Sequence, residues 1–299
     1  MIDFPEYRRL LYLVNDNLDG LLPGADVNSA SLSESMRYSL KAGGKRIRPV
    51  LLLAACELAG GDTTEALPYA CAVEYIHTYS LIHDDLPAMD DDDMRRGAPT
   101  NHRVYGEATA ILAGDGLLTS AFEVMYKDMF MYFDKPEMLK KRARAAYELS
   151  KACGCRGMIA GQIADIEAEN VSVSPELLDY IQVNKTAALI RAAAVAGGYI
   201  GGAGAELIDS LSAYGENLGL AFQIADDILD VTGEEKELGK ATGHDAELRK
   251  ATWPSVHGME ESRRMMSELT RKAIECISSY DRNTDFFAEI ARGLARRTR

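Results

Sequence analysis

Two clusters of aspartates lie far apart in this chain, and both could bind metal. The first runs from Asp84 to Asp90, and the second runs from Asp226 to Asp230. Crowded carboxylates raise one another's pKa unless a positive charge lies between them. Oxygen-only ligand sets suit Mg²⁺, Ca²⁺ or Mn²⁺, and Mg²⁺ usually adds waters and substrate phosphates to one or two carboxylates. The clusters therefore predict a divalent metal ion and a phosphorylated ligand.

The second cluster has helical spacing. Gln223, Asp226, Asp227 and Asp230 fall at positions i, i+3, i+4 and i+7, so they share one stripe of a helix. The surrounding run, 218–231, is otherwise mostly apolar. We expect this polar stripe to face a water-filled cleft.

The first cluster requires a bend in the chain. Asp84 and Asp90 are six residues apart, and a straight helix would place them about 120° from each other. Pro87 can end or bend the helix so that Asp90 folds back. Asp91–Asp93 fit a solvated acidic surface equally well. His77 shares a helical stripe with Asp84 two turns away, and is either a core histidine or a ligand.

Basic segments accompany the acidic clusters. Gly43-Gly44-Lys45-Arg46-Ile47-Arg48-Pro49 combines glycines, which allow close backbone approach, with cations at the start of an expected helix. It could bind an anion without metal, although a basic loop can also be plain solvated surface. Arg95-Arg96 follows the first cluster, and Lys185-Thr186 interrupts an apolar helix.

Together these segments predict two phosphorylated ligands that are treated differently. A diphosphate chelated by Mg²⁺ is a good leaving group, because the cation stabilises the charge that develops as the C–O bond breaks. A diphosphate bound only by Lys and Arg is anchored without comparable activation. One ligand would ionise and the other would attack.

Composition narrows the class of protein. The chain has 299 residues, 47% hydrophobic and 26% charged, as in ordinary globular proteins with a sizeable core. Its net charge of −13 repels nucleic acid and anionic membrane. An anionic substrate would therefore need metal and locally clustered Lys and Arg.

The expected location is the cytoplasm. The cysteines number five, an odd number, and residues 1–9 lack the long apolar core of a secretory signal. Both features favour a reduced cytosol. Arg191 interrupts the best apolar stretch, so none approaches the ~20 residues needed to cross a bilayer. We expect no membrane partner.

The expected fold is an all-α helical bundle in a single domain, 1–299. No linker or composition break divides the chain, and few segments alternate as strands do. We expect helices over 68–87, 174–196 and 205–231. Gly197-Gly198 would end the second of these.

Several motifs follow one another from about Ser31 to the end of the sequence. They are 43–49, His77–His83 leading into Asp84–Asp90, Arg95-Arg96-Gly97, Gly161-Gln162-Ile163-Ala164-Asp165, Lys185-Thr186, Phe222-Gln223 leading into Asp226–Asp230, and Gly239-Lys240. In this order they resemble the trans-isoprenyl (polyprenyl) diphosphate synthases, and most closely the bacterial short-chain farnesyl diphosphate synthases. The resemblance implies an isoprenoid-synthase bundle around a central active-site cavity.

The resemblance also implies a role for each matching residue. The metal ligands would be Asp84, Asp90 and Asp226, supported by Asp85 and Asp230. They would bind three Mg²⁺ ions, or Mn²⁺ in their place. The groups that hold the allylic diphosphate or face its cation would be Arg95, Lys185, Thr186, Gln223 and Lys240. The groups that hold isopentenyl diphosphate would be Lys45, Arg48, His77 and Arg96. The catalytic residues would be Asp84, Asp90, Lys185, Gln223 and Asp226. The supporting residues would be Gln162, Asp165 and the tail Arg296-Arg297.

The implied reaction joins dimethylallyl or geranyl diphosphate head-to-tail to isopentenyl diphosphate, in a homodimer. Helical spacing puts Ser80 most directly beneath Asp84. In the resembled enzymes, however, the residue five positions before the motif limits product length, and an aromatic such as Tyr79 goes with a C15 product. Farnesyl diphosphate is therefore the expected main product, with geranyl or geranylgeranyl diphosphate as alternatives.

Two more distant alternatives are a terpene cyclase and an inactive regulatory subunit. A cyclase has no second diphosphate to anchor, so the basic groups Lys45, Arg48, His77 and Arg96 argue against it. Both aspartate motifs are intact, which argues against an inactive subunit. A calcium-binding protein would show the loop rhythm of an EF-hand, and we find none in the sequence.

Overall fold

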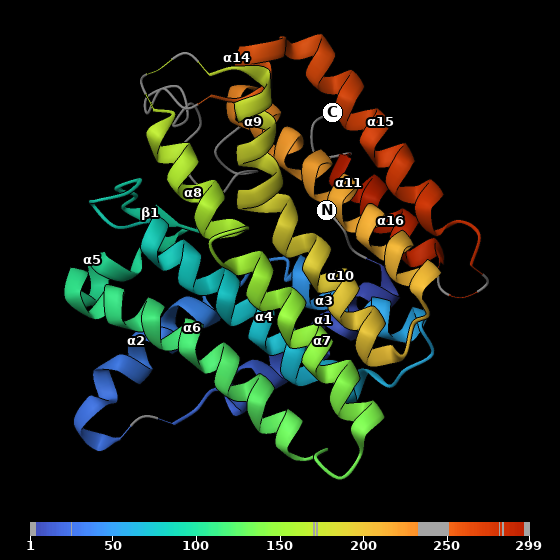
Figure 1. Ribbon diagram of the computed structural model, residues 1–299. Helices are drawn as coiled ribbons and strands as arrows, with labels where there is room; N and C mark the ends of the chain where they lie inside the picture. Colours follow the sequence, from blue (N-terminus) through green and yellow to red (C-terminus); the bar gives the residue numbers. More distant parts are fainter. Residues whose placement is uncertain are drawn as a thin grey trace.

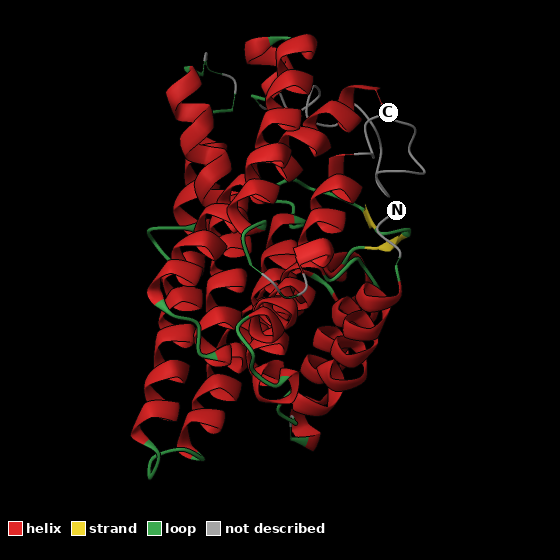
Figure 2. Ribbon diagram, turned by 90° about the vertical axis from the view of Figure 1, so that its right-hand side faces the viewer, coloured by secondary structure: helices red, strands yellow, loops and turns green. Residues whose placement is uncertain are grey.

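The computed structural model describes residues 4–24, 26–169, 171, 173–232, 251–280, 282 and 284–295. Over these residues the chain is almost wholly helical, with one short hairpin of strands β1 and β2 (Figures 1 and 2). The all-α prediction is confirmed. In chain order the elements are α1 (Pro5–Leu21), η1 (Val27–Ser29), α2 (Ala30–Lys41), α3 (Ile47–Leu58), α4 (Thr63–Asp84), β1 (Met94–Arg95), β2 (Ala98–Pro99), α5 (Asn101–Tyr105), α6 (Glu107–Phe130), α7 (Pro136–Cys153), α8 (Met158–Glu167), α9 (Pro175–Gln182), η2 (Val183–Ala187), α10 (Ala188–Gly201), α11 (Ala205–Thr232), α14 (Trp253–His257), α15 (Met259–Ile277) and α16 (Thr284–Ala295).

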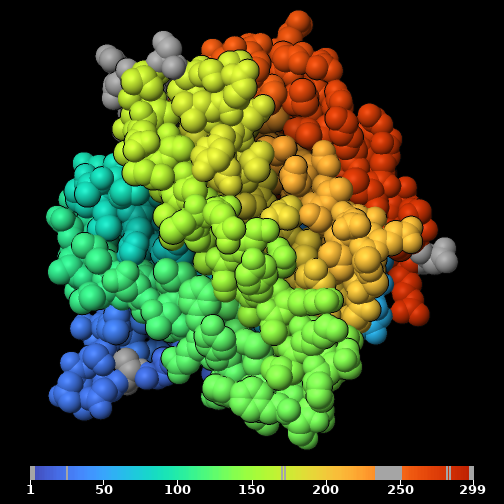
Figure 3. Space-filling model, viewed as in Figure 1, coloured from blue at the N-terminus to red at the C-terminus, as the bar shows by residue number. Residues whose placement is uncertain are grey.

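The core is built around α3, α4 and α10. Helix α4 packs against α3 and α6, and α10 packs against α3, α7 and α11. Every residue from Val50 to Ala55 in α3 is fully buried, as expected for a helix that is apolar on all sides. In the space-filling view, α7 to α10 cover the front face and α15 follows one edge (Figure 3).

Two of the expected helix boundaries are wrong. Helix α4 begins at Thr63, before Pro68, because the Asp62 side chain caps it by accepting a 2.9 Å hydrogen bond from the Thr64 backbone N–H. Gly197 does not end α10, which continues to Gly201. A Cβ added at Gly197 would lie 2.0 Å from the Leu52 carbonyl oxygen, so this glycine allows α10 to pack closely against α3.

The helix expected over 174–196 contains an irregular turn. Segments α9, η2 and α10 follow one another directly, and η2 is a π-helical turn that carries Lys185 and Thr186. Such turns are rare and are frequently found at functional sites. The expected helix 205–231 is confirmed, since α11 spans Ala205–Thr232.

The sequence predicts no apolar stretch long enough to cross a bilayer, but helix α6 is such a stretch. Among the described helices, it alone is long and apolar enough to cross a bilayer by length and composition. In the 18-residue stretch of α6 that meets this criterion, 44% is buried inside the protein. A core helix passes the same test. Ala113, Leu117 and Ala121 are fully buried, and α6 packs along α4, so this face of α6 belongs to the core.

Candidate active site

One cavity of about 810 Å³ brings both aspartate clusters and the basic segment together. It lies at the carboxyl-terminal end of α4 and is also lined by α8, η2 and α11. Lys240 and the Arg296-Arg297 tail lie outside the described residues. The other predicted site residues that line the cavity are Lys45, Arg48, His77, Tyr79, Ser80, Asp84, Asp90, Arg95, Arg96, Lys185, Thr186, Gln223 and Asp226.

The first aspartate cluster folds back as the sequence predicts. Helix α4 ends at Asp84, and the Asp90 backbone N–H donates a 2.9 Å hydrogen bond to the Asp84 carbonyl oxygen. Asp91 then takes a left-handed conformation, with φ of 51°. Asp84 and Asp90 are thereby presented to the same cavity.

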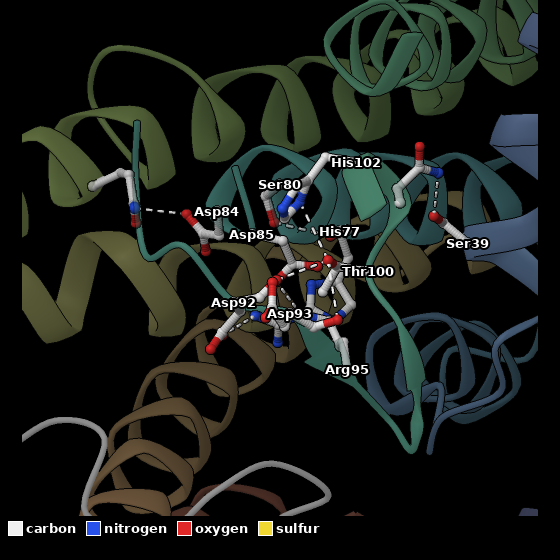
Figure 4. A network of polar contacts seen from close by, with 12 residues as sticks. Ser39, His77, Ser80, Asp84, Asp85, Asp92, Asp93, Arg95, Thr100 and His102 are labelled. Carbon is white, nitrogen blue, oxygen red and sulfur yellow. Dashed lines mark hydrogen bonds and ion pairs between the residues drawn. The ribbon is translucent and has the colours of Figure 1, made fainter. Parts of the chain in front are cut away.

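Asp85 has a different role from its neighbour Asp84. Arg95 donates from Nε to Asp85 Oδ1 at 2.5 Å and from Nη2 to Asp92 Oδ2 at 3.2 Å. Figure 4 shows this network, with Asp84 lying apart from it. Burial raises the pKa of Asp85 to about 7, although Arg95 opposes the shift. Asp92 is therefore an ion-pair partner, which sequence reasoning did not assign.

The second cluster is divided in a similar way. Asp227 is buried and accepts hydrogen bonds from Gln182 Nε2 (2.9 Å), Gln223 Nε2 (2.8 Å) and the Trp253 backbone N–H (2.9 Å). These contacts tie α11 to α9 and α14. Asp226 is half-buried and lines the cavity, so the predicted polar stripe does face a cleft.

The π turn η2 places two polar side chains in the cavity. Lys185 Nζ donates to Asp165 Oδ2 on α8 at 2.6 Å, and Thr186 Oγ1 donates to Gln223 Oε1 on α11 at 2.8 Å. Burial lowers the pKa of Lys185, but the carboxylates of Asp84, Asp165 and Asp90 raise it by more, so the pKa lies above its ordinary value. Lys185 is therefore a cation among the aspartates of the cavity.

Arg46 of the basic segment forms a buried ion pair with Glu74. Arg46 has a φ of 51° and turns inward, where Nη1 donates to Glu74 Oε1 at 2.6 Å, both side chains being buried. Its guanidinium also donates to the Leu40 carbonyl. Lys45, Arg46 and Arg48 all line the cavity, so the buried pair lies in the cavity wall. The buried pair therefore holds the basic segment against α4, the helix on which Glu74 lies one turn before His77.

Positive charge is concentrated around His77. Burial, with help from Arg96, lowers the pKa of Arg48 to about 10, although Glu74 opposes the shift. Burial and the nearby Arg48 and Arg96 lower the pKa of His77 well below its ordinary value. Arg96 also donates to the Gly43 carbonyl. His77 is thus neutral, beside cations that can receive an anion.

Tyr79 and Ser80 lie on the cavity wall, between His77 and Asp84 on α4. Tyr79 is buried, and its hydroxyl has no hydrogen-bond partner among the described residues. Its ring meets His83 edge-on at 5.7 Å between centroids. Ser80 Oγ donates to the His77 carbonyl at 2.9 Å.

The donor set fits a hard cation that is completed by a ligand. Among the described residues, no group of three or more His, Cys, Asp or Glu side chains is arranged to hold a metal ion by itself. Asp84, Asp90 and Asp226 nevertheless offer carboxylate oxygens to one cavity. This arrangement suits Mg²⁺, which takes few protein ligands and adds phosphate oxygens.

The comparisons with known proteins decide the family. Residues 29–285 match the polyprenyl synthetase family. The chain belongs to this family. It is 48% identical over 272 residues to the chloroplastic heterodimeric geranylgeranyl pyrophosphate synthase large subunit 1 of Arabidopsis thaliana, covering 90% of this chain and 72% of the relative.

Solved structures agree with this membership. An FPP/GFPP synthase from Zymomonas mobilis shares 34% identity with a TM-score of 0.84, covering 97% of both chains. A geranyltransferase from Helicobacter pylori, complexed with magnesium and isoprenyl diphosphate, shares 31% identity with a TM-score of 0.83, covering 98% of this chain and 97% of that one. The chain is therefore a prenyltransferase of the isoprenyl synthase fold, and it elongates prenyl chains.

The prediction of a cytoplasmic location is wrong. The Arabidopsis relative is chloroplastic, and so are other plant relatives at similar identity. The cysteine pattern indicated only a reducing compartment, and this property does not separate the cytosol from other reducing compartments.

Sequence reasoning missed one polar residue of the cavity, Glu74, and named another, Gln162, as a supporting residue without its partner. Gln162 Nε2 donates to Asp84 Oδ1 at 2.6 Å, although the sequence implied only a supporting position for Gln162. Glu74 was not assigned at all. A signal was available, because Glu74 is a charged residue inside an apolar helical run and lies three residues before His77.

Proposed function

We propose that this protein condenses an allylic diphosphate head-to-tail with isopentenyl diphosphate in a Mg²⁺-dependent reaction. The observation that carries the proposal is that one cavity combines aspartates whose charges act on Lys185 with arginines whose charges act on His77. We call these two parts its acidic half and its basic half. Asp84, Asp90 and Asp226 line the acidic half. Lys45 and Arg48 line the basic half.

The acidic half would bind the allylic diphosphate. Asp84, Asp90 and Asp226 would hold up to three Mg²⁺ ions, which stabilise negative charge on the leaving diphosphate. The magnesium complex of the Helicobacter pylori geranyltransferase supports this choice of metal. The side chains that would orient the diphosphate and face the allylic cation are Arg95, Lys185, Thr186 and Gln223, and we place Lys240 with them from its motif alone.

The basic half would bind isopentenyl diphosphate without metal. Lys45, Arg48 and Arg96 would form charge-assisted hydrogen bonds with its phosphate oxygens. Neutral His77 would donate one further N–H. Both substrates would then share one cavity, with their hydrocarbon parts facing each other.

The reaction follows from this placement. The C–O bond of the allylic diphosphate breaks, and its electron pair leaves with the diphosphate. The π electrons of the isopentenyl double bond form the new C–C bond to the allylic carbon. A proton is then lost to the released diphosphate, which completes a trans alkene. Holding the two carbons in contact supplies much of the rate enhancement, because it removes the entropy of encounter.

The main product that we propose is geranylgeranyl diphosphate. The support is the 48% identity to a plant geranylgeranyl pyrophosphate synthase subunit. Farnesyl diphosphate, the product expected from sequence, is a second candidate. It is favoured by the bulky Tyr79 on the cavity wall.

We also propose that the protein is a single-domain homodimer. One hydrophobic cluster runs from Tyr7 in α1 to Leu294 in α16, which supports a single domain. The outer face of α6 and the turn after it carry large exposed apolar side chains, a feature that marks protein interfaces. They are Leu112, Tyr126, Phe130, Met131 and Phe133.

The test is a product assay. Purified protein is incubated with labelled isopentenyl diphosphate and each allylic starter in turn, and the dephosphorylated alcohols are sized. We expect C20 as the main alcohol, and no product after chelation of divalent metal. A main C15 alcohol would select the second candidate. Formation of a cyclic terpene without isopentenyl diphosphate would refute the function.

A further inference from the structure

The π turn η2 lies between two glycines on opposite sides. On α8, a Cβ added to Gly161 would lie 2.2 Å from the Lys185 backbone nitrogen and 2.7 Å from its Cα. On α11, a Cβ added to Gly219 would lie 2.6 Å from the Ala187 Cα. Both distances are far below van der Waals contact, and in both cases the obstacle is backbone, which cannot rotate away.

Each glycine is followed one helical turn later by the side chain that holds the π turn. Asp165, four residues after Gly161, pairs with Lys185 at 2.6 Å. Gln223, four residues after Gly219, accepts from Thr186 at 2.8 Å. Residues four apart lie on the same helix face. Each flanking helix therefore combines a gap for the backbone of η2 with a polar partner for its side chain.

We propose that Gly161 and Gly219 are positioning residues for prenyl transfer. Their missing side chains let η2 approach α8 and α11 closely enough for Lys185 and Thr186 to face the acidic half of the cavity. This inference rests on the proposed function, because it requires these two side chains to contact the allylic diphosphate.

Gly215 provides a matched control on the same helix. A Cβ added there would lie 2.5 Å from the Arg191 Cα, as close as the contact of Gly219. Its neighbour, however, is the regular helix α10, and Arg191 does not line the cavity. Gly215→Ala and Gly219→Ala therefore create similar clashes one turn apart, of which only the second meets the π turn.

The first measurement is steady-state kinetics of the full chain. Misplacing a catalytic contact by about 1 Å can cost ~10²-fold in rate, so we expect a loss of that size in kcat for Gly219→Ala and Gly161→Ala. The KM for isopentenyl diphosphate should stay near wild type. Gly215→Ala should lower Tm about as much as Gly219→Ala does, but it should keep kcat near wild type. Equal losses of kcat in Gly215→Ala and Gly219→Ala would overturn the proposal.

The second measurement needs no substrate. Lys185 is acylated with an amine-reactive ester, and its modification rate is followed by mass spectrometry. Displacement of η2 should separate Lys185 from Asp165 and speed the reaction in Gly161→Ala and Gly219→Ala, but not in Gly215→Ala. If the alanine variants do not fold, Asp165→Asn removes the Lys185–Asp165 pair without a clash and should also speed the acylation of Lys185. A wild-type rate in the folded variants would refute the role of η2, whereas inactive wild-type protein would refute only the proposed function.

Discussion

At the scale of single residues, neighbours in the sequence have opposite roles in the structure. Asp226 and Asp227 both line the cavity, but Asp226 is half-buried, whereas Asp227 is buried and accepts three hydrogen bonds. Arg46 and Arg48 also both line the cavity, but Arg46 is buried in an ion pair with Glu74. A carboxylate with that many donors has little capacity left for a metal ion, so we propose Asp226, and not Asp227, as a metal ligand in this cluster.

Replacing Asp84 or Asp226 by alanine should reduce turnover far more than stability. Each variant removes oxygens from the proposed metal site, where leaving-group charge would develop, and the loss of one such electrostatic contact typically costs ~10²–10³ in rate. The measurement is kcat at saturating Mg²⁺, together with the free energy of unfolding. Asp93→Ala is the control, because Asp93 is exposed and pairs only at the surface with Arg103. Near-normal turnover in Asp226→Ala would show that Asp226 binds no metal.

Lys45→Ala and Arg48→Ala should raise the KM for isopentenyl diphosphate selectively. A hydrogen bond to a charged group contributes about 1.5–3 kcal/mol, which corresponds to roughly 10- to 100-fold in KM. The KM of the allylic starter and the Mg²⁺ dependence should not change, since this segment recruits no metal. Equal weakening of both substrates would contradict the two-site arrangement.

His77 should titrate differently with and without a bound anion. Its pKa is lowered by burial and by Arg48, Arg96, Arg46 and Arg95. In the free protein this group therefore favours folding above the unfolded pKa, ~6.5, and that stability is lost as pH falls below it. Inorganic diphosphate should offset the arginine charges and raise the pKa of His77. Imidazole NMR titrations with and without diphosphate measure the shift, and identical titrations would place the anion elsewhere.

At the scale of elements, α4 connects the two halves of the cavity and also lines its wall. Glu74, His77, Tyr79 and Asp84 all project from this one helix. One helical turn rises about 5.4 Å, roughly the length of one isoprene unit. Residues about one turn before Asp84 can therefore limit how far a growing chain extends along the helix.

Tyr79→Ala should lengthen the main product by at least one isoprene unit without abolishing catalysis. The substitution removes a buried ring from the cavity wall while leaving Asp84 in place. Tyr79→Phe is the matched control, because the Tyr79 hydroxyl has no partner among the described residues, and it should keep the wild-type product. Sizing of the alcohols from both variants provides the measurement. An unchanged length in Tyr79→Ala would show that Tyr79 does not limit the chain.

At the scale of the whole molecule, helix α6 has two faces of different character. One face packs on α4 with Ala113, Leu117 and Ala121 fully buried. The opposite face carries Leu112 at 59% and Phe130 at 63% exposure. A second copy of the chain would cover such a surface and remove its apolar area from water.

Leu112→Glu should weaken the proposed dimer. A charge placed in an apolar interface must be desolvated without a partner, which opposes association. Sedimentation analysis of the 32.7 kDa chain should show dimers for wild type and a shift towards monomer for the variant. Tyr12→Glu is the control, since Tyr12 is 71% exposed on a different helix, α1. A monomeric wild-type protein would refute the homodimer.

The sequence by itself was sufficient for the class of chemistry and for most helices. Helical spacing placed Gln223, Asp226 and Asp230 on one stripe, and Pro87 predicted the fold-back of Asp90. These conclusions depend on residues within a few turns of one another, so local geometry settles them. The order of the motifs then indicated the family, which the comparisons confirmed.

Only the tertiary structure decided which of two neighbouring residues is tied into buried contacts in the cavity wall. Arg46 turns inward because Glu74, 28 residues away, receives it, and Asp227 is buried because Gln182 and Trp253 donate to it. The close packing of Gly197 on Leu52, and of Gly161 and Gly219 on the π turn, likewise depends on helices far apart in the chain. Local patterns carry no information about these partners, because packing between distant segments determines them.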